Sequence, residues 1–141
     1  SPLVNISGFP ADLGDVWISD SAPVVGDLTS SSPGPEIVLS TQVPGSLVGQ
    51  LHIFGSNGSY ILPRQSMQTG FGVTNAIADL DNDGRNELIV GGRAGTSGFL
   101  DSIWVFDLDR NLANPLPHGP VLWGQFGRNP ERCNCSKISD L

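Results

Sequence analysis

The acidic run between residues 79 and 87 has the residue types and spacing best suited to chemistry. It reads Asp79-Leu80-Asp81-Asn82-Asp83-Gly84-Arg85-Asn86-Glu87, so aspartates alternate, a glycine follows the third, and a carboxylate stands at the ninth position. Calcium takes about six to eight oxygen ligands at about 2.3–2.6 Å, and clustered carboxylates repel one another without a cation between them. We therefore predict a Ca²⁺ site with side-chain ligands from Asp79, Asp81, Asp83 and Glu87 and the backbone carbonyl of Arg85.

Two other interpretations of this run stand beside that prediction. An EF-hand opens with the same acidic spacing, but it requires a glutamate at the twelfth position and a helix on each side. Here the twelfth position is Val90, and the flanking residues have strand character. A solvated turn is the remaining alternative, because Asp, Asn and Gly are ordinary turn residues.

An earlier run, from Asp27 to Glu36, matches the acidic run but has two carboxylates where the acidic run has four. Thr29 and Ser31 stand where the second and third aspartates would be, and one residue is added. Two carboxylates create far less repulsion than four, so this run is predicted to form a turn without a metal.

Short β-branched and aromatic segments must position these two runs. They are bounded by Gly, Pro, Asn and Ser, which is the pattern of strands separated by turns. No stretch shows a sustained helical period of apolar residues. The chain is therefore predicted to be all-β, with strands at residues 22–25, 36–40, 50–54, 75–78, 87–90 and 102–106.

These segments repeat along the chain in one order. Pro23–Leu28 corresponds to Asn75–Leu80 at an offset of 52, Glu36–Val38 to Glu87–Ile89 at 51, and His52–Phe54 to Trp104–Phe106 at 52. A unit of this length with four antiparallel strands has the size of a propeller blade. We expect about two four-stranded blades plus flanking strands, forming a partial or oligomer-completed β-propeller. The divisions are 1–21 (N-terminal strand segment), 22–74 (first repeat), 75–115 (core of the second repeat, with the calcium loop) and 116–141 (C-terminal tail).

The acidic pattern followed by Leu88-Ile89-Val90-Gly91-Gly92 resembles the FG-GAP/VCBS repeat. The resemblance covers roughly residues 22–115, and the run from Trp123 to Asn129 is similar to the aromatic tail of bacterial arrays of this kind. It implies an integrin α-chain-like, calcium-bearing propeller of a bacterial-type secreted protein. The ion would tie the loop between the first two strands of a blade in a structural role, and no enzyme is implied.

The composition excludes several other classes of function. With 141 residues, a net charge of −7 and a pI near 4.4, the chain lacks the basic stripe that a nucleic-acid partner requires. Its apolar runs are far shorter than the about 18 residues of a membrane span. It has no nucleophile elbow, phosphate loop or zinc-type Cys/His spacing, so we expect no catalytic residues and assign His52 and His118 to structure or surface.

Other features bear on localisation. The chain starts at Ser1, which is expected either of an exported protein whose signal peptide has been removed or of an excised fragment. Glycosylation sequons at Asn5, Asn57 and Asn134 favour a secreted or cell-surface protein. Cys133 and Cys135 are the candidate disulfide residues. A bridge between them, two positions apart, fits ordinary disulfide geometry poorly, so a link to another chain or two free thiols stands as an equal alternative.

Two blades alone cannot close a propeller, so their outer faces must be covered. The alternatives are a ring or filament of copies, a fragment of a larger propeller, and a self-sufficient monomer. We expect an extracellular calcium-binding repeat protein with a structural or adhesive role that self-associates. The alternative is a carbohydrate-binding propeller module that uses Tyr60 and the indole faces of Trp17, Trp104 and Trp123, although tryptophans here also suit packing between blades.

Overall fold

The computed structural model describes residues 4–5, 7–14, 16, 22–46, 48–63, 65–67, 75–94 and 100–123. Within these ranges the chain forms strands and turns and no helix, as the predicted all-β class requires. The described residues accordingly include no helix long and apolar enough to cross a membrane.

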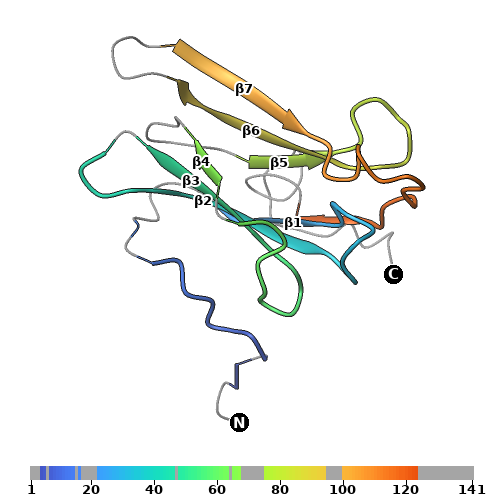
Figure 1. Ribbon diagram of the computed structural model, residues 1–141, viewed down its shortest axis with the longest axis horizontal. Coiled ribbons are helices and arrows are strands. Elements are labelled where there is room, and N and C mark those ends of the chain that lie inside the picture. Colours follow the sequence, from blue (N-terminus) through green and yellow to red (C-terminus); the bar gives the residue numbers. More distant parts are fainter. Residues whose placement is uncertain are drawn as a thin grey trace, which may run out of the picture.

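Among the described residues, eight strands form two antiparallel sheets that do not close on each other. The strands are β1 (Val24–Gly26), β2 (Glu36–Gln42), β3 (Gly49–Phe54), β4 (Gln65–Met67), β5 (Asn75–Ala78), β6 (Glu87–Ala94), β7 (Leu100–Phe106) and β8 (Val121–Trp123). One sheet has five strands in the order β4-β3-β2-β1-β8, and the other has three in the order β5-β6-β7. Figure 1 shows the two sheets as separate layers, with β6 and β7 above β2 and β3.

The two halves of the chain share one pairing register. Gly26 pairs with Glu36 as Ala78 pairs with Glu87. A shift of 52 residues from β1 to β5, and of 51 from β2 to β6, converts each of the remaining β1–β2 pairs into a β5–β6 pair as well. The β2–β3 pair Ile37 and Phe54 likewise corresponds to the β6–β7 pair Leu88 and Phe106. The repeat seen in the sequence is therefore a repeat of strand pairing.

The fourth strand distinguishes the two units. In the first unit β4 extends the sheet beyond β3 as expected, whereas the three-stranded sheet ends at β7 among the described residues. Residues 117–119, which correspond to β4, are bound elsewhere: the His118 N–H donates to the Gly84 carbonyl at 2.9 Å, and the Gly119 N–H donates to Asp27 Oδ2 at 2.7 Å. The strand that follows, β8, pairs with β1 of the first unit. The expectation of a four-stranded second unit is therefore wrong for the described residues.

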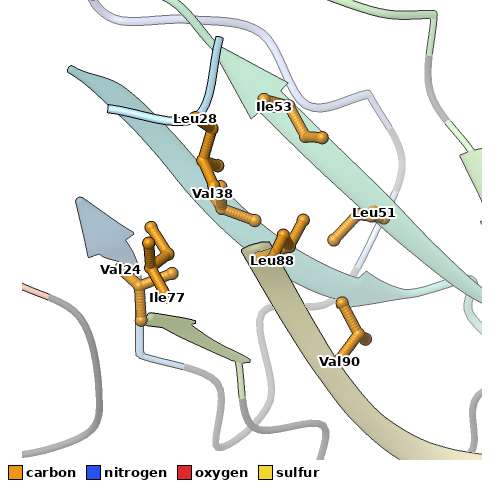
Figure 2. Close-up of a cluster of buried hydrophobic side chains, with 8 residues drawn as sticks. All are labelled: Val24, Leu28, Val38, Leu51, Ile53, Ile77, Leu88 and Val90. Carbon is orange, nitrogen blue, oxygen red and sulfur yellow. The ribbon is translucent and has the colours of Figure 1, made fainter. Parts of the chain in front are cut away.

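The core lies between the two sheets. Its buried side chains come from both sheets and from the loop after β1: Val24, Leu28, Val38, Leu51, Ile53, Ile77, Leu88 and Val90. Figure 2 shows Leu88 and Val90 of β6 facing Val38 and Leu51 of the other sheet. Gly26 leaves room for this packing, because a Cβ there would lie 3.2 Å from Ile77 Cδ1. Burial of these aliphatic side chains on both inner faces is what holds the layers together.

Candidate metal centre

The acidic run forms the loop between β5 and β6, and it brings three carboxylates to one point. Ligand oxygens of Asp79, Asp81 and Glu87 lie within 4.8 Å of one another. Two oxygens on opposite sides of one calcium ion are separated by about twice the Ca–O distance, or about 4.8 Å. These three groups are therefore close enough to share an ion. Asp79 and Asp81 are exposed and Glu87 is buried, so the group is open to solvent on the aspartate side.

Backbone geometry and hydrogen bonds shape the loop. Gly84 has a φ of 85° and Asn82 a φ of 60°, left-handed values that turn the chain back toward its start. Asp79 accepts hydrogen bonds from the Asp83 N–H at 3.2 Å and the Gly84 N–H at 3.0 Å. Glu87 Oε2 accepts from the Leu80 N–H at 2.8 Å, which fixes the closing carboxylate against the opening of the loop.

Asp83 lies apart from the other three carboxylates. Its Oδ2 accepts a hydrogen bond from Arg85 Nε at 2.8 Å and a further one from Arg85 Nη2, and Arg85 Nη1 lies 3.2 Å from Asp107 Oδ2. The Arg85 hydrogen bond lowers the pKa of Asp83. Of the five predicted ligands the structure thus gathers Asp79, Asp81 and Glu87, while the Asp83 carboxylate is paired with the guanidinium of Arg85.

The corresponding loop of the first unit keeps the same closing contact but binds a different group. Glu36 Oε2 accepts from the Leu28 N–H at 2.8 Å, as Glu87 does from Leu80. Thr29, at the position of Asp81, donates its Oγ1 hydrogen to Asp109 Oδ1 at 2.5 Å. The N–H and hydroxyl of the neighbouring Ser30 donate to Asp109 Oδ2 at 2.8 and 2.7 Å. The hydroxyl-rich loop therefore binds the Asp109 carboxylate, an anion of the same chain. The acidic loop instead has carboxylates that could bind a cation.

His118 connects Asp109 to the acidic loop. The Asn86 N–H donates to His118 Nδ1 at 2.7 Å, so the other ring nitrogen, Nε2, carries a proton and donates to Asp109 Oδ2 at 3.2 Å. The side chains of His118 and Asp109 are fully buried. Both ring nitrogens are used in this network, which supports the structural role assigned to His118. The two loops and the turn after β7 thus form one hydrogen-bonded unit, which we call the interloop network (Thr29, Ser30, Asn86, Asp109 and His118).

Burial and hydrogen bonding act in opposite directions on two carboxyl groups here. Burial raises the pKa of Asp109, but the hydrogen bonds from Thr29, Ser30 and His118 outweigh it and lower the pKa to about 2. Burial raises the pKa of Glu36, whose Oε1 has no hydrogen-bond partner. Asp109 is therefore ionised at neutral pH, so both of its side-chain oxygens can accept hydrogen bonds from the donors around it.

The remaining predicted site residues are exposed, pack against other residues of the chain, or lie outside the described residues. Asn5 and Asn57 are exposed, and Asn57 Oδ1 accepts from the Ser59 N–H at 2.9 Å. Trp104 packs against the core, and the Tyr60 ring lies 4.4 Å from that of Phe54, so both aromatic groups serve packing within the chain. The positions outside the described residues are Trp17, Asn134, Cys133 and Cys135, and the Trp123 side chain is likewise not described.

His52 is a buried structural residue, in line with the sequence analysis. It is fully buried, and its ring nitrogens lie 2.8 Å from Thr41 Oγ1 and 2.9 Å from the Tyr60 hydroxyl.

Comparison with known proteins finds no match to this chain among protein-family models, curated proteins or solved structures.

Proposed function

We propose that this chain is an extracellular calcium-binding repeat protein with a structural or adhesive role. The observation that carries the proposal is the convergence of Asp79, Asp81 and Glu87, whose ligand oxygens lie within 4.8 Å of one another. Carboxylate oxygens are the ligands that calcium prefers, and three of them at one point are stabilised by a divalent cation. The resemblance of the loop to the FG-GAP/VCBS repeat supports the same proposal.

We further propose that each unit is a propeller-type blade. The shared register of the two units supports this, because Gly26–Glu36 and Ala78–Glu87 are equivalent pairs and both units end their first loop on a glutamate held by a leucine N–H. Face-to-face packing of the two sheets, with the aliphatic core between them, also fits neighbouring blades.

The mechanism is stiffening of the second loop. Asp79, Asp81 and Glu87 would hold the ion, with Asp83 joining once it leaves Arg85 and the Arg85 carbonyl completing the set. A bound ion supplies positive charge that neutralises the carboxylates. Gly84 and Asn86 of this loop bind His118, so a fixed loop also fixes the interloop network between the two units.

Calcium is therefore expected to raise the thermal stability of the chain, and Asp81→Ala is expected to remove that effect. A ligand that binds only the folded state at ten times its Kd adds about 1.4 kcal/mol. The measurement is the melting temperature with added CaCl2 and with EGTA, together with calorimetric titration of the metal alone. Asp12→Ala removes an exposed aspartate outside the loop and should keep the full calcium response. An equal melting temperature with CaCl2 and EGTA for the unchanged chain would refute the metal site.

Arg85→Gln is expected to tighten calcium binding severalfold. The substitution frees Asp83 from its ion pair and removes a positive charge beside the site, while it leaves the backbone carbonyl of residue 85 in place. Calorimetric titration gives the affinities, and Arg110→Gln, which changes an exposed arginine of the turn after β7, serves as the matched control. Weaker binding in Arg85→Gln than in Arg110→Gln would show that Asp83 is not a ligand.

A further inference from the structure

The outward side of the three-stranded sheet carries a continuous apolar surface. Ile103 is 75% exposed and Val105 is 51% exposed. The strand registers place Ala76 beside Ile89 and Ile89 beside Val105, and they place Gly91 beside Ile103. We call this surface the outer face (Ala76, Ala78, Ile89, Gly91, Ile103 and Val105). Along β5 and β6 its residues alternate with the core residues Ile77, Leu88 and Val90, so they lie on the side of the sheet away from the core.

The repeat shows what kind of group covers such a face. Ala76, Ile89 and Val105 correspond to Val24, Val38 and Ile53, which form the same row across β1, β2 and β3. That row is buried, at 1%, 0% and 3% exposure. It is covered by the inner side of the second unit, where Ile77 pairs with Leu88 and Leu88 with Phe106. The outer face is thus equivalent to a face that, one unit earlier, packs against a sheet.

A second copy of this chain carries the equivalent of the covering row. Val25 pairs with Ile37 and Ile37 pairs with Phe54, in the positions that Ile77, Leu88 and Phe106 take in the second unit. Phe54 at one end of this row is buried, with the Tyr60 ring against it, but Val25, Ile37 and Leu39 are half-buried. Pro23 at the edge of the row is exposed. The first unit therefore presents a partly open row of the type that covers an outer face, on the side of its sheet opposite the core.

From this correspondence we infer that two copies of the chain stack head to tail, with the Val25–Ile37 row of one copy on the outer face of the next. The contact continues the interface between the two sheets across the molecular boundary. Such a contact joins different surfaces, so each copy keeps one free end and the stack grows with concentration. The inference goes beyond the proposed function by giving a geometry to the self-association expected from the sequence, and it depends on no bound metal.

The first test is the mass in solution as a function of concentration, at about 0.15 M salt to screen the net charge of −7. The unchanged chain is expected to rise from 14.8 kDa to multiples of that mass in sedimentation or light-scattering experiments. Ile103→Lys is expected to stay at the single-chain mass. Because the new lysine lowers the net negative charge, loss of association cannot come from stronger general repulsion. Leu116→Lys, at a position 65% exposed and outside the outer face, should associate like the unchanged chain.

The second test distinguishes head-to-tail stacking from pairing of two outer faces. Ile37→Lys alters only the opposite row, and Pro23→Lys does the same at an exposed position if Ile37→Lys does not fold. Each of these two row variants, Ile37→Lys and Pro23→Lys, should remain a single chain by itself. A row variant keeps an intact outer face and Ile103→Lys keeps an intact row, so a mixture of the two should form one-to-one dimers and nothing larger. Association of a folded row variant by itself, or a single-chain mass for the unchanged chain at every concentration, overturns the inference.

Both tests are repeated with CaCl2 and with EGTA. Association that survives EGTA while calcium fails to bind would refute the proposed metal site and keep the stack. Calcium binding by a chain that never associates would refute the stack and keep the proposed metal site.

Discussion

Leu88→Ala is expected to lower the free energy of unfolding by about 3 kcal/mol, one of the two largest single effects that the structure predicts. Leu88 is fully buried between the sheets, where it faces side chains of the opposite layer (Figure 2). Truncation removes buried methyl and methylene groups and leaves a cavity, which costs about 2–5 kcal/mol for a leucine in a core. Urea unfolding followed by circular dichroism measures the change.

The matched control for this substitution is Leu116→Ala. It removes the same atoms from a side chain that is 65% exposed, so its effect should stay within about 0.5 kcal/mol. A loss below about 1 kcal/mol for Leu88→Ala would mean that the two sheets do not pack on each other as described.

Asp109→Ala is expected to cost a similar amount, about 3 kcal/mol. Its carboxylate accepts hydrogen bonds from Thr29, from Ser30 and from His118, and its removal leaves these buried donors without an acceptor. Hydrogen bonds to charged groups contribute about 1.5–3 kcal/mol, and an unsatisfied buried donor costs about 1–3 kcal/mol. The same unfolding experiment measures the change, with Asp12→Ala as the control at an exposed acid. A small loss in Asp109→Ala would show that the interloop network does not hold the two units together.

The pKa of Asp109 gives this prediction a pH dependence. Because the folded-state pKa of about 2 lies below the ordinary value of 3.8, the stabilisation is complete above that ordinary value and is lost as the pH falls toward 2. The shift corresponds to about 2 kcal/mol. Asp109→Asn keeps the side-chain shape but does not titrate, so the stability difference between it and the unchanged chain should shrink as the pH falls through this window. A difference that stays constant would contradict the role given to the ionised carboxylate.

Most of the fold could be predicted from the sequence. The six predicted strands all form, because Gly, Pro, Asn and Ser mark their ends and the apolar residues between them alternate. The repeat offsets also predict the equivalent registers. The partner of β8 could not be predicted, since a strand of three residues carries too little pattern to specify a neighbour. That pairing follows from contacts of His118 with Gly84 and of Gly119 with Asp27, which no local pattern encodes.

The candidate site was predictable to the extent that it is local. The convergence of Asp79, Asp81 and Glu87 follows from their spacing in one loop. Asp83 forms an ion pair with Arg85, and the spacing of the residues does not determine whether the Arg85 side chain forms that pair or extends into solvent. The interloop network was missed because Thr29 and Asp109 are 80 residues apart in sequence. The only signal in the sequence was that Thr29 and Ser31 replace two aspartates of the first loop, because their hydroxyl groups can donate hydrogen bonds to a carboxylate elsewhere in the chain.

The pairing of β8 with β1 has a consequence for how the chain folds. The first strand of the larger sheet finds one of its neighbours only near the end of the described chain, so that sheet is completed only after residues 121–123 have left the ribosome. Contacts between such distant segments slow folding, because the entropy of closing a long loop is lost before the contact forms. The two halves should consequently unfold in one cooperative transition, and a chain cut before residue 121 should lose structure in its N-terminal half.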